Sequence, residues 1–349
     1  MKVFLTGVDG YIGCVLAPMM LDAGIEVVAL DTGYYRDGWL YSDPSRVSRM
    51  PMTIIKDLRD ITEDDLAGCD AVVHLAELSN DPLGENNPTI THDINHLGSV
   101  ALAKKARAAG VRRFVYTSSC SVYGLGSGEF LDETSQVNPQ TAYAECKVLV
   151  ERDVAQLATD DFSPVFLRNA TAYGASPRMR FDIVLNNLAG FAWTTDKIVM
   201  TSDGTPWRPI VHVEDICSAI ICAAQAPAEA VHNQVFNVGN TAENYRIREI
   251  AEIVAEVFPG CDLEIGPPGG DNRSYRVNCD KIAESLPGFA CRWSAKDGAE
   301  QLLSVFKSID MSPEIFTFRA FTRLKQLTYL QDTHQLDDSF YWKARASAA

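Results

Sequence analysis

The sequence predicts an α/β fold with a doubly wound parallel sheet and a smaller C-terminal region. At the start of the chain, the apolar segment Lys2–Thr6 leads into a glycine-rich turn and then into Cys14–Ala23, which has helical spacing and ends before Gly24. Helical or loop stretches then alternate with short apolar segments, as in a parallel sheet with helices on both faces. These segments are 26–30, 53–55, 71–75, 114–116 and 165–168.

Length and composition narrow the class of protein. The chain has 349 residues, enough for one large or two modest domains, and 46% of them are hydrophobic. No window approaches the ~20 consecutive apolar residues of a membrane span. Because Met1–Leu5 leads into Thr-Gly without a cleavage site, we expect a strand rather than a signal peptide. The net charge of −15 argues against nucleic acid or an anionic membrane as a partner.

The cysteine and histidine patterns predict no metal site. The nine cysteines are scattered without a Cys-x-x-Cys pair, which suits reduced thiols in the cytoplasm and argues against zinc. His92 and His96 stand four residues apart and form a candidate metal pair, but no third ligand accompanies them. A solvated helix face explains these two histidines equally well.

The glycine-rich turn predicts a dinucleotide site of the Rossmann type. Its glycines permit a tight turn, and the helix that follows offers free N–H groups to a pyrophosphate. Asp31 ends the next strand, eighteen residues after Gly13, where a carboxylate binds the ribose hydroxyls of NAD and repels the 2′-phosphate of NADP. Asp9 is unusual so near a diphosphate, and we expect its side chain to point away or to cap the helix. The cofactor residues predicted here are Gly7, Gly10, Tyr11, Ile12, Gly13 and Asp31.

Further cofactor contacts are predicted where the next strands end. Asp57 and Leu58 follow the third strand, where an Asp can meet the adenine. Leu75 and Ala76 lie at the carboxyl end of the fourth strand, which is where ligands bind in open α/β sheets. The loop at 79–84 follows that strand end, and we expect it to border the substrate.

Tyr143 and Lys147 form the candidate catalytic pair. On a helix, residues four apart share one face, one turn apart. A free phenol titrates near pH ~10, and a neighbouring ammonium lowers its pKa towards the range where general base catalysis is most effective. The spacing also occurs by chance in many helices. Ser119 ends a strand 24 residues before Tyr143 and can present a hydroxyl to the phenol, although serines at strand ends are often only turn chemistry.

The ordered set of motifs resembles the extended short-chain dehydrogenase/reductase family, in its NAD-dependent nucleotide-sugar epimerase/dehydratase branch. The resemblance extends to about Trp293. It implies that Tyr143 is the acid/base, that Lys147 lowers the pKa of Tyr143 and holds the nicotinamide ribose, and that Ser119 hydrogen-bonds the reacting hydroxyl. It also implies that Asn95, in a long helix expected over 88–109, supports the catalytic helix and belongs to the cofactor site.

Two residues after Ser119 depart from the family pattern. Dehydratases of the family carry Asp and Glu where this chain has Cys120 and Ser121, and the decarboxylases need Glu at the second position. Both activities are therefore disfavoured. Cys120 is a candidate proton donor, but a small buried thiol is the favoured interpretation.

The resemblance implies further substrate contacts in the second half of the chain. The pair Asn187-Leu188 resembles a diphosphate-binding motif, and Arg208 resembles an arginine that binds the substrate phosphates with its planar fork. A surface arginine in a turn is the alternative for Arg208. The segment 270–276 resembles a nucleotide clamp. The predicted substrate residues are Ser119, Cys120, Ser121, Asn169, Asn187, Leu188, Arg208, Asp271, Arg273 and Tyr275.

These assignments predict how the chain is divided. Residues 1–172 form a NAD-binding domain that is completed by about 210–238, and residues 173–209 and 239–310 form a substrate-binding region. The family pattern stops before 311–349. Apolar residues recur there at roughly helical spacing, which predicts an amphipathic helix that packs on the body or on a partner subunit. The basic residues between them are Arg319, Arg323 and Lys325.

The predicted chemistry is reversible hydride transfer at a sugar carbon, with NAD as cofactor and a nucleoside-diphosphate sugar as substrate. The favoured hypothesis is an epimerase acting at C4, which reduces and reoxidises NAD within one turnover. A one-way dehydrogenase or ketoreductase on a nucleotide sugar or related polyol is the alternative, and the sequence does not separate the two. Intact Ser119, Tyr143 and Lys147 argue against a non-catalytic dinucleotide sensor. The resemblance also implies a homodimer that pairs the helices bearing Asn95 and Tyr143.

Overall fold

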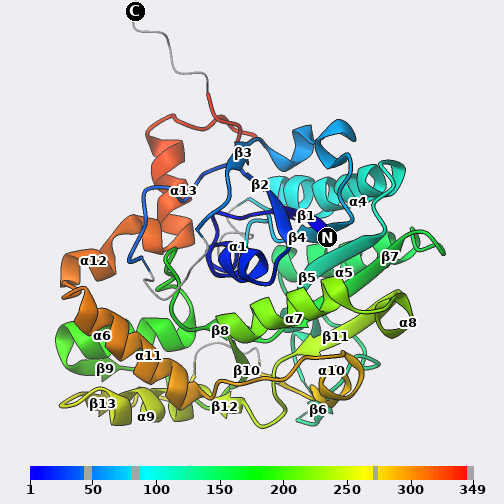
Figure 1. Cartoon of the computed structure of the whole chain (residues 1–349). Helices are drawn as coiled ribbons and strands as arrows, with labels where there is room; N and C mark the ends of the chain where they lie inside the picture. The colour runs from blue at the N-terminus through cyan, green and yellow to red at the C-terminus, as the bar shows by residue number, and fades with distance from the viewer. Residues whose placement is uncertain (43–48, 80–86, 127, 270–273, 344–349) are drawn as a thin grey trace, which may run out of the picture.

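A seven-stranded parallel sheet forms the centre of the molecule (Figure 1). The computed structural model describes residues 1–42, 49–79, 87–126, 128–269 and 274–343. The strand order is β11-β7-β5-β4-β1-β2-β3, and each neighbouring pair is parallel. The chain builds outward from β1 in both directions, which confirms the predicted doubly wound class. The strands are β1 Lys2–Thr6, β2 Glu26–Asp31, β3 Thr53–Ile55, β4 Ala71–His74, β5 Arg113–Ser119, β7 Ser163–Asn169 and β11 Gln234–Val238.

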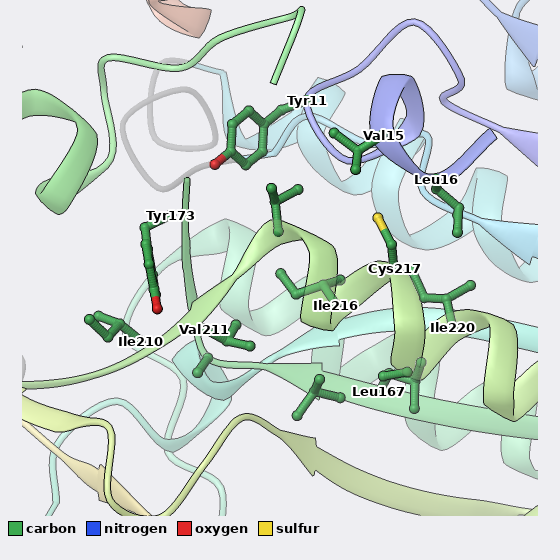
Figure 2. Packing of buried hydrophobic residues seen from close by; sticks show 14 of the residues in the cluster. Tyr11, Val15, Leu16, Leu167, Tyr173, Ile210, Val211, Ile216, Cys217 and Ile220 are labelled. Atoms are coloured by element: carbon green, nitrogen blue, oxygen red, sulfur yellow. The ribbon is translucent and has the colours of Figure 1, made fainter. Parts of the chain in front are cut away.

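Helices cover both faces of this sheet, and the alternation of side chains along β1 divides the core between them. Val3 and Leu5 belong to a cluster with α1 and α7, whereas Phe4 packs with α4 and α5 on the opposite face. Figure 2 shows residues of α1 packed toward residues of α7, among them Leu16 and Ile220. The helices are α1 Gly13–Asp22, α4 Ser99–Ala108, α5 Ala142–Ala155 and α7 Val213–Gln225.

Local predictions hold closely in this half of the chain. The helix expected over Cys14–Ala23 is α1, and Gly24 follows it at φ 74°, in the left-handed region that glycine adopts without strain. The helix expected over 88–109 forms as three consecutive pieces. They are α3 Pro88–Thr91, the π-helix η3 His92–Gly98 and then α4.

A second region covers the carboxyl ends of the large sheet. It contains a three-stranded sheet, β12-β10-β8, and two pairs of strands, β13-β9 and β14-β6. The strands are β6 Phe130–Leu131, β8 Thr171–Tyr173, β9 Lys197–Val199, β10 Trp207–His212, β12 Asn244–Arg246, β13 Asp262–Glu264 and β14 Arg276–Val277. The helices of this region are α6 Val184–Thr195, α9 Ile247–Val257 and α11 Ala295–Ser308. Two further helices contact the large sheet itself: α8 Ala228–Val231 precedes β11 and contacts β7, and α10 Asp280–Ser285 packs against β11.

The C-terminal tail packs on the body, which was one of the two predicted arrangements. It folds as several short elements rather than as one long amphipathic helix. They are α12 Pro313–Thr317, the 3₁₀-helix η5 Arg319–Phe321 and α13 Arg323–Asp332. In Figure 1 the tail, in orange and red, lies beside the α1 and β3 end of the molecule. Across the described ranges, no helix combines the length and apolar character needed to span a membrane.

Candidate active site

A cavity of about 740 Å³ lies at the carboxyl ends of the large sheet and extends to the second region. It gathers most of the predicted site residues, although they come from distant parts of the sequence. On the cofactor side these are Gly7, Gly10, Tyr11, Ile12, Gly13, Asp31, Asp57, Leu58, Leu75 and Ala76. The catalytic and substrate residues in the wall are Ser119, Ser121, Tyr143, Lys147, Asn169, Asn187, Arg208 and Tyr275.

The glycine turn is shaped as a dinucleotide site requires. Gly7 has φ 76°, and a Cβ atom on Gly13 would lie 2.3 Å from the carbonyl oxygen of Gly7, so a side chain at Gly13 is excluded. The tight approach leaves the N-terminus of α1 open to the cavity. Asp9 points away from the turn as expected, because its carboxylate accepts from Arg36 Nε at 3.0 Å.

Asp31 is held by the backbone at the end of β2. Its two carboxylate oxygens accept from Asp9 N at 3.0 Å and from Gly33 N at 2.7 Å. Burial nevertheless raises the pKa of Asp31 to about 6. Asp57 also lines the cavity, but Arg59 binds both of its carboxylate oxygens, at 2.8 and 2.9 Å.

The predicted catalytic pair lies in the first turns of α5. The Thr141 side chain caps this helix by accepting from Ala144 N at 3.2 Å, which places Tyr143 at its start. Lys147 Nζ lies 5.4 Å from the centre of the Tyr143 ring and donates to the Thr117 carbonyl at 2.5 Å. Ser119 ends β5 and lines the same cavity.

Glu77 is a site residue that the sequence reasoning did not assign. It is buried, and its Oε2 lies 2.5 Å from Lys147 Nζ while its Oε1 accepts from Tyr116 Oη at 2.7 Å. Burial alone would lower the pKa of Lys147, but the Glu77 carboxylate raises it above its usual value. Lys147 is therefore held as a cation by Glu77. In the sequence, the only indication of a role for Glu77 was its position directly after Ala76, just beyond the end of β4.

Three predicted residues lie outside the cavity wall. Asn95 is fully buried and bonds the backbone of Leu78, accepting from its N at 2.8 Å and donating to its O at 3.0 Å, so it anchors the loop after β4. Cys120 is fully buried against the Arg168 carbonyl, and burial raises the pKa of its thiol, so it is a small buried thiol, as the favoured interpretation expected, and not the alternative proton donor. Leu188 belongs to the hydrophobic core.

Two buried polar atoms at the substrate end of the cavity lack hydrogen-bond partners in the described structure. Ser121 Oγ and Asn169 Oδ1 are buried and make no hydrogen bond within the described structure. Arg208 lies on β10 with its guanidinium 5.7 Å from the Tyr275 ring, so it belongs to the cavity rather than to a surface turn. Asp271 and Arg273 lie outside the described residues.

The candidate histidine pair makes separate contacts. His96 Nε2 lies 2.8 Å from Asp153, and His92 Nε2 lies 3.7 Å from Glu145. Among the residues that the structure describes, no three His, Cys, Asp or Glu side chains are grouped to hold a metal.

The comparison with family models gives one match over most of the chain. The model described as "NAD dependent epimerase/dehydratase family" matches residues 3–239. UDP-glucose 4-epimerase of Mycolicibacterium smegmatis is 30% identical over 326 residues, which cover 88% of this chain and 99% of the relative. UDP-glucuronic acid decarboxylase 1 of Arabidopsis thaliana is 27% identical over 323 residues, covering 88% of this chain and 70% of the relative.

Solved structures show similar folds. MoeE5 in complex with UDP-glucuronic acid and NAD has a TM-score of 0.74 and 26% identity, and the match covers 88% of this chain and 99% of that one. A UDP-glucose 4-epimerase of Thermotoga maritima, solved with UDP-glucose, has a TM-score of 0.75 at 21% identity, with 89% and 100% coverage.

Proposed function

The chain belongs to the NAD-dependent epimerase/dehydratase family, and on this basis we propose that it epimerises a nucleoside-diphosphate sugar at C4 by transient oxidation. That it is a NAD-dependent enzyme of nucleotide sugars follows from the family itself. The observation that carries the finer proposal is a cavity with one evident proton-transfer group, Tyr143, supported by Lys147 and Ser119. Oxidising an alcohol and reducing the ketone again requires only one such group.

The remaining acids of the cavity argue against elimination or decarboxylation. Every carboxylate in its described wall is already bound by a cation or by backbone N–H groups. The pairs are Asp31 with backbone N–H groups, Asp57 with Arg59, Glu77 with Lys147 and Asp182 with Arg180. With Cys120 buried and a hydroxyl at Ser121, the acids that those reactions use in the family are missing. This supports epimerisation.

The residues of the chain divide the proposed reaction among them. A bound NAD would supply the hydride chemistry, as acceptor from the sugar carbon and as donor to the opposite face of the ketone. Tyr143 Oη takes the proton of the sugar hydroxyl as the carbonyl forms, and gives it back when the ketone is reduced. Lys147 stabilises the phenolate of Tyr143 that is present before the proton is taken and again after it is returned, and Ser119 hydrogen-bonds the reacting oxygen. No proton is lost, so the enzyme ends each turnover as it began.

The cavity residues fit NAD. The glycine turn excludes side chains where the diphosphate must approach, and the carboxylate of Asp31 is oriented by two backbone hydrogen bonds. We propose that these residues, with Tyr11, Ile12, Asp57 and Leu58, bind the adenosine and diphosphate. Leu75 and Ala76 would border the nicotinamide end, and Asn187, Arg208 and Tyr275 would bind the nucleotide sugar. Asn95 would act only by holding the loop at Leu78.

Turnover in D₂O with a nucleotide sugar tests the reaction type. The hydrogen that leaves carbon should return to it, so the epimer should carry no carbon-bound deuterium and NADH should not accumulate. UDP-glucose is the first substrate to try, because it is the substrate named for the bacterial relatives. Steady release of NADH, or a need for added NADH, would instead establish a dehydrogenase or reductase. Deuterium at carbon would reveal an acid/base that the proposal lacks.

Asp31 should make cofactor binding depend on pH. Because burial raises its pKa to about 6, the carboxylate that accepts the ribose hydroxyls is lost as the pH falls through that value. NAD should then bind more weakly. The apo protein should respond in the opposite sense, because a buried carboxyl with a raised pKa stabilises the fold at low pH and loses this effect as the pH rises through about 6.

Calorimetric titration of NAD and NADP on both sides of that pH measures this effect. Asp31→Asn should remove the pH dependence and narrow the preference for NAD over NADP. Asp57→Asn is the matched control, because its carboxylate is neutralised by Arg59 and it should leave the pH dependence unchanged. Tighter binding of NADP than NAD by the unmodified protein would contradict the proposed role of Asp31.

A homodimer and a cytoplasmic location complete the proposal. All nine cysteines are free, which supports a reducing compartment. The proposed dimer would pair the helix bearing Asn95 and its continuation α4 with α5. On these helices the small residues Ala101, Ala108 and Val148 are at least partly exposed and can pack against a second subunit. Val150 is fully buried inside the chain and cannot contribute to such an interface. A monomer by light scattering would contradict the dimer.

A further inference from the structure

The C-terminal tail is built into the cofactor side of the molecule, although it lies beyond the matched residues 3–239. Its α13 and the segment after it hold the stretch that follows Asp31. Gln326 Nε2 donates to the Tyr34 carbonyl at 2.9 Å, and Tyr34 Oη donates to the Phe340 carbonyl at 2.5 Å. Trp342 Nε1 donates to the Thr32 carbonyl at 2.7 Å. The tail therefore covers the edge of the sheet where the dinucleotide motif ends.

The guanidinium of Arg323, the first residue of α13, forms no ion pair of its own among the described residues. Its side chain lines the cavity and is among the largest fully buried side chains, and neither Nη1 nor Nη2 makes a hydrogen bond within the described structure. The guanidinium carbon lies 4.0 Å from the centre of the Tyr35 ring. Tyr35 also lines the cavity, and its buried hydroxyl has no partner either. Orphaned donors of this kind are rare in folded proteins, and several together indicate an absent acceptor.

The charges around Arg323 favour an anion. The carboxylate that acts on Arg323, Asp182, is already bound by Arg180 Nε at 2.9 Å and by Arg180 Nη2 at 3.2 Å, and it accepts from the backbone N of Arg323 at 3.2 Å. Burial lowers the pKa of Arg323, and the cation of Arg180 acts in the same direction. Two buried arginines thus share one carboxylate. A buried cation without a counter-charge is costly, and a bound anion removes that cost.

The location identifies which anion fits. Arg323 lines the same cavity as Gly10, Tyr11 and Ile12, which lead into the open N-terminus of α1. That N-terminus is where dinucleotide folds receive a diphosphate. We propose that Arg323 and Tyr35 complete the binding site for the diphosphate of the dinucleotide, and that the tail is thereby a part of the cofactor site. The inference depends on NAD as cofactor and not on which reaction the enzyme catalyses.

Arg323→Met tests this proposal in protein freed of NAD, with ADP-ribose as the probe. Removing an unpaired buried cation should raise the melting temperature of the apo protein, while the affinity for ADP-ribose falls by about 10- to 100-fold, as expected for a charged hydrogen bond worth ~1.5–3 kcal/mol. AMP lacks the diphosphate, so its dissociation constants for the unmodified protein and for Arg323→Met should agree within about threefold. Lys325→Met makes the same charge change two residues away on the exposed side of α13 and should alter neither quantity.

Tyr35→Phe provides a second variant that keeps the ring over the guanidinium. The apo form of this variant should be at least as stable as the unmodified apo protein, and its affinity for ADP-ribose should be several-fold lower. Apo protein that melts lower with unchanged ADP-ribose affinity would make Arg323 a structural residue and overturn the proposal. Weakened UDP binding with unchanged ADP-ribose binding would assign the charge to the diphosphate of the nucleotide sugar instead, and would equally overturn it.

Discussion

Tyr143→Phe should reduce turnover by about 10²–10⁴-fold, the range assigned to a positioned acid/base group. The substitution keeps the ring beside Lys147 and removes only the oxygen that carries the proton. NAD affinity should stay within a few-fold, because the ring and the lysine still occupy the cavity wall. Turnover of the nucleotide sugar and calorimetric binding of NAD measure the two effects separately.

Tyr329→Phe is the matched control for this substitution. Tyr329 is exposed on α13, where its ring lies over Arg319, so losing its hydroxyl should not change turnover. Near wild-type turnover by Tyr143→Phe on the true substrate would show that the proton-transfer group lies elsewhere. Among the described cavity carboxylates, each is bound to a cation or to backbone N–H groups, so such a result would direct attention to Ser119 and Ser121.

The first βαβ unit could be predicted almost to the residue because its determinants are local. Gly7 must adopt a positive φ and Gly13 must leave space for the carbonyl of Gly7, and only glycine meets both demands. Asp31 follows at the spacing that the fold imposes. The Tyr143 and Lys147 pair is local in the same sense, because a helix fixes residues four apart on one face.

Other site residues depend on contacts between distant segments, and spacing alone could not place them. Glu77 acquires its role only when the end of β4 meets Lys147 on α5. Arg323 was expected among the basic residues of an amphipathic helix, yet the fold of the tail buries it against Tyr35. Asn95 was expected both to support the catalytic helix and to belong to the cofactor site, and Cys120 was included among the substrate residues although a buried thiol was the favoured interpretation. Both side chains face the interior, since a motif does not fix which way a side chain faces.

Removing the Glu77 carboxylate should be among the most destabilising single changes in the molecule. Glu77→Ala leaves Lys147 as a buried cation without a carboxylate partner, held only by the Thr117 carbonyl and the neighbouring tyrosine rings among the described residues. Breaking a buried pair in this way costs about 3–5 kcal/mol. Urea unfolding measures the change in free energy of unfolding. Glu264→Gln is the control, because the Glu264–Lys197 pair is exposed and its loss should have little effect.

The dependence of stability on pH should reverse in Glu77→Gln, which keeps the shape but not the charge. In the native protein the Glu77 carboxylate raises the pKa of Lys147, so the stabilisation by this lysine is complete below its unfolded pKa of ~10.4 and is lost only as the pH rises through the higher folded value. Without Glu77, burial is the largest remaining effect on the pKa of Lys147, and we expect it to lower that pKa. The unfolded chain then binds more protons than the folded one, so the stability of the variant should rise as the pH increases from neutral towards ~10. Urea unfolding of both proteins across this interval gives the two slopes. A variant whose stability stays flat over the same interval would show that Lys147 does not depend on Glu77 for its charge.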